Sequence, residues 1–215
     1  MKIFCLPIVH SWNTFDSQLL KSVSPQRQEK IMRYVFESDR KLSLYAALLA
    51  RMTLSIITGI PASELIFSIG KNQKPLLLST SNYQFNLSHT HNFILCGISN
   101  NGMIGVDVEK KETAPINIMK QIFHPQEIEY VMNSPVYERN TRFYKVWTRK
   151  EAYTKKIGTG LIGDLKSYNT LSFSLSSSIY TWQHHNYVCS VCGNLVSNIN
   201  ICNISEYDIQ SYFLL

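Results

Sequence analysis

Two acidic residues, Asp107 and Glu109, stand two positions apart in a segment whose alternating residues predict a β-strand over residues 103–109. The preceding Asn100-Asn101-Gly102 is a hairpin turn signal, which supports this strand. Side chains two apart on a strand point to the same face, about 6–7 Å from each other, so both carboxylates could reach one small cation. An ordinary hairpin with a wet acidic face has the same pattern, so the pair alone does not identify a metal site.

A further acidic residue, Glu151, lies in a predicted helix over residues 140–157 that ends at Gly158. One stripe of this helix repeats every fourth residue and changes from apolar to polar along the chain: Phe143, Trp147, Glu151 and Lys155. Glu151 therefore continues a face that is turned toward the core. By itself, Glu151 with Lys155 is an ordinary ion pair one helical turn apart, which contributes about 0.3–0.5 kcal/mol.

The elements that must position these residues come in two similar sets. Ser24-Pro25-Gln26 and, a hundred residues later, His124-Pro125-Gln126 each place proline in the first turn of a predicted helix. Alternating, turn-punctuated segments typical of strands follow each helical region. We therefore predict an α+β fold of two similar halves, residues 1–102 and 103–215.

The composition is that of a globular protein, because 45% of the 215 residues are apolar and 17% are charged. Five scattered cysteines favour reduced thiols and a cytoplasmic location. Residues 1–10 lack the pattern of a signal peptide, and polar residues interrupt every apolar stretch before it reaches the roughly 18 residues of a membrane span. The formal net charge of +6 favours an anionic partner and leaves nucleic acid, nucleotide and acidic protein open.

Taken together, the two acidic regions are specific. Gly105-Val106-Asp107-Val108-Glu109, followed by Trp147-Thr148-Arg149-Lys150-Glu151-Ala152-Tyr153-Thr154-Lys155, resembles the two signature motifs of 4′-phosphopantetheinyl transferases. The likeness extends to the Sfp-type branch of that family through Lys74-Pro75, through Phe85-Asn86-Leu87-Ser88-His89, and through Ser24-Pro25 with the basic helix after it. It covers most of the chain, and it implies that the two halves form a pseudo-dimer with the active site between them.

The resemblance implies transfer of the phosphopantetheine arm of coenzyme A to a serine of an acyl or peptidyl carrier protein, with release of 3′,5′-ADP. Asp107, Glu109 and Glu151 would be the ligands of Mg²⁺, because three carboxylates repel each other without a hard cation between them. Glu151 is also implied as the base that accepts the serine proton. Lys150 and Lys155 would contact the phosphates, and Glu127 would assist through a water or complete the metal shell.

For the nucleotide end of coenzyme A, the resemblance places Ser88 and His89 at the phosphates and Lys74 with Pro75 beside the adenine. Arg27 and Lys30 align with basic residues that hold the 3′-phosphate. The sequence departs from the family pattern at two positions. Leu42 stands where a phosphate-binding arginine is common, with Arg40 or Lys41 as substitutes, and Gln73 replaces a glycine.

Two rival functions remain at this point. A module that binds nucleic acid through its basic surface is favoured by the charge but not by the acidic residues. A homologue that binds coenzyme A without transferring it is disfavoured by the presence of all three acids and both lysines. We expect a monomer that binds neither nucleic acid nor membrane, and the sequence leaves the identity of its carrier protein open.

Overall fold

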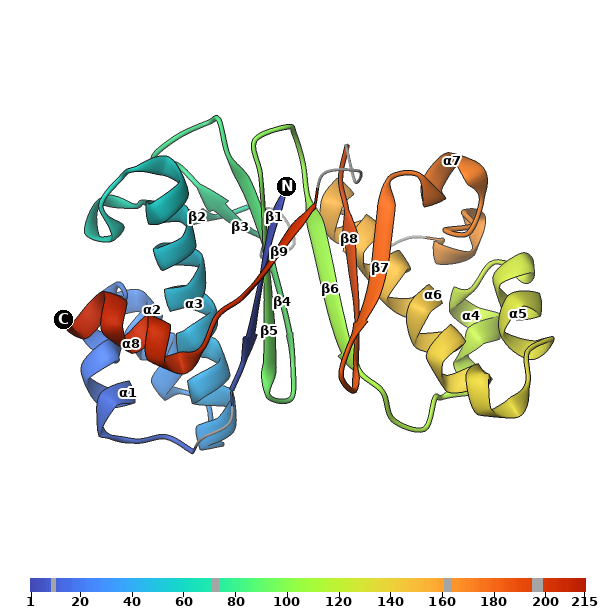
Figure 1. Cartoon of the computed structure of the whole chain (residues 1–215), viewed down its shortest axis with the longest axis horizontal. Coiled ribbons are helices and arrows are strands. Elements are labelled where there is room, and N and C mark those ends of the chain that lie inside the picture. Colours follow the sequence, from blue (N-terminus) through green and yellow to red (C-terminus); the bar gives the residue numbers. More distant parts are fainter. Residues whose placement is uncertain (9–10, 71–73, 161–163, 195–198) are drawn as a thin grey trace.

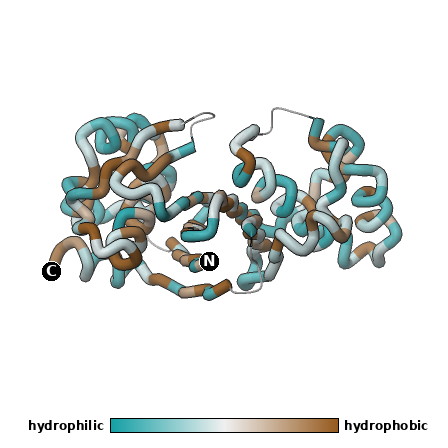
Figure 2. Tube along the Cα trace, turned by 90° about the horizontal axis from the view of Figure 1, so that it is seen from above, coloured by the Kyte–Doolittle hydropathy of each residue, from teal (hydrophilic) through white to brown (hydrophobic). Residues whose placement is uncertain are grey.

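The structure is a computed structural model that describes residues 1–8, 11–70, 74–160, 164–194 and 199–215. Helices gather at the two ends of the long axis, and the strands of two sheets lie between them (Figure 1). The view from above shows the same two lobes on either side of the central strands (Figure 2). The predicted α+β class is confirmed.

The first half is built on a four-stranded sheet in the order β4-β5-β1-β9 and a separate β2-β3 hairpin. Its strands and helices, in chain order, are β1 (Lys2–Pro7), α1 (Thr14–Leu19), α2 (Pro25–Met32), α3 (Glu37–Thr58), β2 (Phe67–Ile69), β3 (Pro75–Leu77), β4 (Gln84–Thr90) and β5 (Phe93–Ser99).

The second half is built on a three-stranded sheet in the order β6-β8-β7. Its elements are β6 (Gly105–Lys110), α4 (Met119–Ile122), α5 (Pro125–Met132), α6 (Val136–Ile157), α7 (Phe173–Ser176), β7 (Ile179–His184) and β8 (Tyr187–Cys192). The chain then ends in β9 (Asn200–Asn203) and α8 (Glu206–Leu214). Short 3₁₀ helices connect these elements at Leu20–Ser22, Ala62–Glu64, Ile116–Ile118 and Leu165–Ser167.

The two halves repeat one topology. In each, a strand is followed by an eight-residue helix with proline in its first turn, a 22-residue helix and two antiparallel strands. The strand registers also agree, since Pro7 pairs with Phe93 while Lys110 pairs with Tyr187. Both long helices end at a glycine with left-handed backbone, Gly59 (φ 75°) and Gly158 (φ 78°). The faint sequence repeat therefore reflects a structural repeat.

The sheets pack face to face between the two long helices. One face of the first sheet packs on α3, and its other face meets the apolar face of β6 and β8. The far face of the second sheet packs on α6. Along the seam, the side chains of Asn86 and Ser88 accept hydrogen bonds from the backbone of Val106 (2.9 Å) and Val108 (3.4 Å). Polar side chains of β4 thus bond β6 directly.

The C-terminal segment crosses back into the first half. β9 pairs in parallel with β1, and α8 packs on α1 and α3. The fully buried Lys41 ammonium joins them, because it lies 2.8 Å from Glu206 and 3.4 Å from Asp16. Residues 199–215 therefore belong structurally to the first half, whereas the sequence placed them in the second.

Helix α3 is long and apolar enough to cross a membrane by length and composition alone. In the structure it is the central helix of the first half, and 72% of its most apolar window is buried inside the protein.

Gly105 allows β6 to lie close against α6. A Cβ at this position would collide with the carbonyl oxygen of Ala152 and the backbone nitrogen of Lys156, which cannot move aside as a flexible side chain could. We expect Gly105→Ala to lower the free energy of unfolding by about 2–3 kcal/mol, as forced overpacking does. Chemical denaturation would measure the loss. The matched control is Gly59→Ala, which meets nothing within 4 Å and should lose only the roughly 1 kcal/mol of a strained backbone.

Candidate active site

Asp107 lies at the centre of a polar cluster between β6 and α6. The residue is buried, with 2% exposed, and its Oδ1 accepts hydrogen bonds from Lys155 Nζ (2.6 Å) and Ser88 Oγ (2.9 Å). Its Oδ2 is buried and has no hydrogen-bond partner among the described residues. A buried carboxylate oxygen without a partner is costly, so this atom is poised to bind a cation or a donor from a ligand.

Glu109 shares the face of Asp107, as the alternation of a strand predicts. Its Oε1 accepts a hydrogen bond from Trp147 Nε1 (3.2 Å), and its Oε2 accepts one from Thr90 Oγ1 (3.3 Å). Burial raises the pKa of Glu109, and the negative charge of Asp107 raises it further. The like charges therefore disfavour the ionised form until a cation balances them.

Glu151 approaches the same cluster from α6. Burial and, next, the charge of Asp107 raise its pKa to about 7, an effect that Lys155 partly opposes. A carboxylate with this pKa exchanges protons near neutral pH, which is the property needed in a general base.

The cluster fits a hard divalent cation by its chemistry. Its donors are carboxylate oxygens, one of them without a partner, and the charges of Asp107 and Glu109 both raise the pKa of Glu151. Among the residues that the structure describes, no three acidic, histidine or cysteine side chains are already arranged to hold a metal ion. The predicted three-carboxylate shell is thus not assembled here. Lys155 supplies the positive charge beside Asp107 instead.

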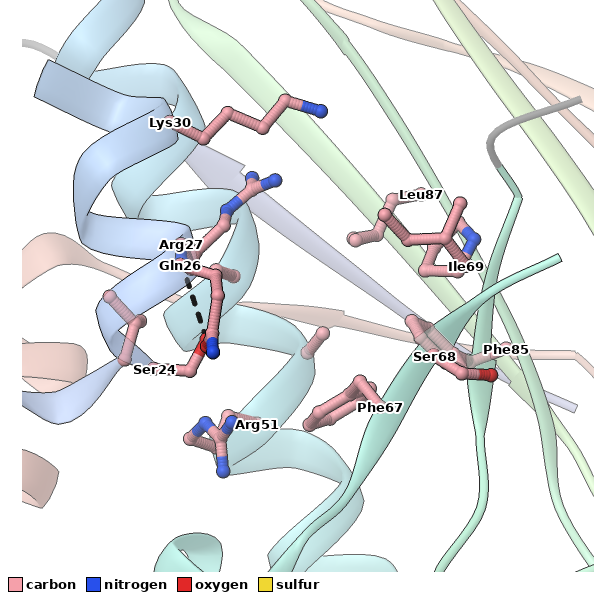
Figure 3. Close-up of a pocket in the computed structure, with 14 residues that line it drawn as sticks. Ser24, Gln26, Arg27, Lys30, Arg51, Phe67, Ser68, Ile69, Phe85 and Leu87 are labelled. Carbon is pink, nitrogen blue, oxygen red and sulfur yellow. Dashed lines mark hydrogen bonds between the residues drawn. The ribbon is translucent and has the colours of Figure 1, made fainter. Parts of the chain in front are cut away.

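Four of the residues predicted for the nucleotide line one of two cavities, whereas Ser88 contacts Asp107 and Lys74 contacts Lys155. Arg27, Lys30 and Pro75 line a cavity of about 520 Å³ between α2, α3 and the β2-β3 hairpin (Figure 3). The guanidinium of Arg27 donates to the carbonyl of Ser43 (2.9 Å). Figure 3 shows Arg27 and Lys30 projecting from successive turns of α2.

His89 lines the other cavity, of about 620 Å³, together with Thr90 and Leu42. Partial removal from water lowers the pKa of His89, and the positive charges of Lys155 and Arg27 lower it further. His89 therefore lies within electrostatic reach of both the carboxylate cluster and the basic cavity.

Other predicted residues make different contacts. Lys74 donates to the carbonyl of Lys155 (2.7 Å) at the C-terminal end of α6, and burial lowers its pKa. This ammonium ties the first half to the second. Lys41 is not available as a substitute phosphate ligand, because it is buried against Asp16 and Glu206. Arg40 donates to the carbonyl of Tyr34 (2.8 Å), and Gln73 lies outside the described residues.

Glu127 and Lys150 do not join the carboxylate cluster. They form an ion pair of 2.8 Å with each other and are almost fully buried, at 0% and 1% exposed. Lys150 also donates to the carbonyls of Leu165 (2.7 Å) and Tyr168 (2.9 Å), and Glu127 accepts from the backbone and hydroxyl of Thr170. These contacts hold the segment after α6 and give no support to a role of either residue at the metal or phosphates.

An internal comparison supports the structural role of Lys150. Arg51 occupies the equivalent position of α3 and likewise donates to two carbonyls of the following segment, those of Ala62 and Leu65. Arg51 also lies over the ring of Phe67, at 5.0 Å, as Lys150 lies over that of Tyr168, at 4.4 Å. The long helix of each half thus uses one cation to fasten the chain that follows it.

At the equivalent positions of the first half, which the structure describes, the carboxylate cluster is not repeated. With the strand registers and helix ends aligned, the equivalents of Asp107, Glu109, Trp147 and Glu151 are Phe4, Leu6, Leu48 and Met52. All four apolar residues belong to one hydrophobic core. At these four positions the repeated framework therefore carries polar residues only in the second half.

Sequence reasoning missed Thr90 as a partner of Glu109, and it missed the direct contact of Trp147 with the same carboxylate. Trp147 stood in a recognised motif, so a polar role for its indole N–H could have been considered. Thr90 carried no signal beyond its place next to His89.

Comparison with known proteins gives a consistent result. Residues 103–205 match the model of the 4′-phosphopantetheinyl transferase superfamily, and residues 8–100 match that of the 4′-phosphopantetheinyl transferase N-terminal region. The chain is 28% identical over 210 residues to the 4′-phosphopantetheinyl transferase gsp of Aneurinibacillus migulanus, covering 91% of this chain and 87% of that one. It is 27% identical over 154 residues to the 4′-phosphopantetheinyl transferase Sfp of Bacillus subtilis (strain 168), covering 72% and 68%. A crystal structure of Thermotoga maritima holo-[acyl-carrier-protein] synthase is a distant match, with a TM-score of 0.34, 18% identity, and 41% and 60% coverage.

Proposed function

The chain belongs to the 4′-phosphopantetheinyl transferase superfamily, and we propose that it moves 4′-phosphopantetheine from coenzyme A to a serine of an acyl or peptidyl carrier protein in a Mg²⁺-dependent reaction. The observation that carries this proposal is the carboxylate cluster, in which Asp107, Glu109 and Glu151 lie together with Lys155 between β6 and α6. The second product would be 3′,5′-ADP.

Asp107, Glu109 and Glu151 would hold the metal. Magnesium, when bound, supplies positive charge to the phosphates and helps to align them for in-line attack. Asp107 has the strongest claim to be a ligand, because its Oδ2 is buried without a partner.

Glu151 would accept the proton during transfer. The serine oxygen of the carrier attacks the phosphorus next to the pantetheine arm, and the hydroxyl proton passes to a carboxylate oxygen of Glu151. The bond from that phosphorus to the bridging oxygen of 3′,5′-ADP breaks, and the leaving oxygen keeps the electron pair. Lys155 would stabilise the charge that develops on the phosphates.

A mass-spectrometric assay tests this function. The protein would be incubated with coenzyme A, Mg²⁺ and an apo carrier protein, and the carrier would then be weighed intact. Addition of one phosphopantetheine per carrier is expected. A homologue that only binds coenzyme A would bind the donor and leave the carrier unmodified, which would contradict the proposal.

The cavity lined by Arg27 and Lys30 leads to a prediction about coenzyme A, the substrate that donates phosphopantetheine. Arg27 and Lys30 support recognition of the 3′-phosphate, so coenzyme A that lacks this phosphate should be the poorer substrate. Charge-assisted hydrogen bonds contribute about 1.5–3 kcal/mol, so kcat/KM should fall roughly 10- to 100-fold. Steady-state kinetics with the two donors would measure the ratio. Equal efficiency would assign Arg27 and Lys30 to another role.

We further propose a monomer in the cytoplasm. The two halves already supply both sides of the seam, so a second copy is not needed to complete the site. The five free cysteines, four of them buried, support a reducing location.

A further inference from the structure

We propose that Thr90 is a positioning residue that holds the Glu109 carboxylate in the orientation needed for the metal. Thr90 stands at the end of β4 in the first half, whereas Glu109 stands on β6 in the second. The inference rests on the proposed Mg²⁺-dependent function and adds a residue from the opposite half to the metal site.

Each oxygen of the Glu109 carboxylate has its own donor. The indole N–H of Trp147 reaches Oε1 at 3.2 Å, and the hydroxyl of Thr90 reaches Oε2 at 3.3 Å. The indole is itself fixed, because it stacks on Phe143 with an angle of 12° between the rings. One donor comes from α6 and the other from β4, so the plane of the carboxylate is set from two sides. The lone pairs that remain on both oxygens are free to meet a cation.

The hydroxyl of Thr90 also contacts the next residue. A threonine hydroxyl has one proton, and the carboxylate of Glu109 can only accept it in their hydrogen bond. His91 Nδ1 lies 3.2 Å from the same Oγ1, and the direction of that contact depends on the tautomer of the ring. On the other side of the ring, His91 Nε2 lies 3.3 Å from Glu112, which also pairs with Lys110 at 3.2 Å.

The backbone of the turn is common to both halves. His91 adopts a left-handed conformation, with φ 42°, which is uncommon for residues other than glycine. The matching hairpin of the second half has His185 in the same conformation, with φ 50°. The equivalents of Thr90, Glu109 and Trp147 are, however, His184, Leu6 and Leu48. Both halves thus have the same hairpin shape. The hydrogen bonds that join Thr90, Glu109 and Trp147 have no counterpart at the equivalent positions.

Substitution of Thr90 by valine tests the role, because valine keeps the shape and removes the hydroxyl. We expect Thr90→Val to weaken Mg²⁺ binding about tenfold, the lower end of the range for residues that orient metal ligands. Thr90→Ser restores the hydroxyl and should bind Mg²⁺ within about twofold of the wild type. Isothermal titration of the intact protein with MgCl₂ would measure these affinities without relying on turnover.

Two comparisons make the test specific. Thr80→Val is the matched control, since the Thr80 hydroxyl only accepts a local hydrogen bond from Asn82, and its Mg²⁺ affinity should not change. Trp147→Phe removes the other donor while keeping an aromatic ring on Phe143, and it should show a loss similar to that of Thr90→Val. It gives an independent reading should the valine variant fold poorly.

The outcomes separate the inference from the proposed function. Wild-type Mg²⁺ affinity in folded Thr90→Val, or loss of affinity in Thr90→Ser equal to that in the valine variant, would overturn the positioning role. Absence of Mg²⁺ binding by the wild-type protein would instead overturn the metal site of the proposed function, and the inference with it. Weak binding by the valine variant together with rescue by serine supports both.

Discussion

Replacing Asp107 with asparagine should reduce transfer by at least about 10²–10³-fold, the loss expected when a preorganised electrostatic group is removed from a phosphoryl-transfer site. Asparagine keeps the size of the side chain but removes the charge beside Lys155 and the anionic Oδ2. Single-turnover transfer from coenzyme A to an apo carrier would measure the rate, and titration would measure Mg²⁺ affinity, which should fall as well.

The stability of this variant separates chemistry from folding. Asp107 raises the pKa of both Glu109 and Glu151, so its removal relieves repulsion in the metal-free protein. Lys155 loses its charged partner but keeps the hydrogen bond to Ser88 Oγ (2.9 Å), and its ammonium is partly exposed and can turn to solvent. We therefore expect little change in the melting temperature without metal. Wild-type turnover in Asp107→Asn, or undiminished turnover of the wild-type protein in excess chelator, would contradict the proposed magnesium site.

Replacing Glu151 with glutamine should reduce turnover by about 10²–10⁴-fold if this residue is mainly the general base. Glutamine keeps the size and one carbonyl oxygen but cannot accept the serine proton. In that case, Mg²⁺ and coenzyme A should bind with nearly native affinity. If Glu151 is mainly a metal ligand, Mg²⁺ affinity should fall, and high Mg²⁺ should restore much of the rate. Calorimetric titration beside single-turnover kinetics distinguishes the two roles.

The same variant should change the pH dependence of stability in metal-free protein. The ordinary pKa of Glu151 is 4.5, and its pKa in the folded protein is raised to about 7. Between these values the folded state binds the proton more tightly than the unfolded state, so the free energy of unfolding falls as pH rises from about 4.5 to about 7. With allowance for solvent screening, the contribution is on the order of 1 kcal/mol.

In Glu151→Gln this decline should be smaller, with the remainder due to Glu109, whose pKa is also raised. The matched control is Glu138→Gln on the same helix, where the carboxylate forms a partly exposed ion pair with Arg142. Its turnover and its Mg²⁺ affinity should match those of the wild type. If Glu151→Gln keeps native turnover and native Mg²⁺ affinity, Glu151 is neither the general base nor a metal ligand. It is then only a helical neighbour of Lys155.

Local pattern was sufficient to predict much of the framework. Alternation placed Asp107 and Glu109 on one face of a strand, and the proline and glycine signals marked the ends of helices α5 and α6. These features depend on residues within a few positions of each other, so a sequence reveals them directly.

Contacts between distant segments were harder to predict. Lys150 and Glu151 are neighbours in sequence but point about 100° apart around the helix, so one meets the segment at Leu165 and Tyr168 while the other meets the seam. No periodicity shows which loop will cover which side of a helix. For the same reason, the sequence did not indicate that β9 would return to pair with β1.

In the first half, the positions of the carboxylate cluster are occupied by Phe4, Leu6, Leu48 and Met52, which pack in one hydrophobic core. This difference bears on the stability of the whole fold. Carboxylates gathered in one place destabilise a fold, since the charge of Asp107 disfavours the ionisation of both Glu109 and Glu151. The two halves differ in what they contribute to stability at these positions. The first half buries apolar side chains there, whereas the second half holds carboxylates that repel one another. Because the two sheets pack together, the stability contributed by the first half offsets the cost of the repulsion in the second.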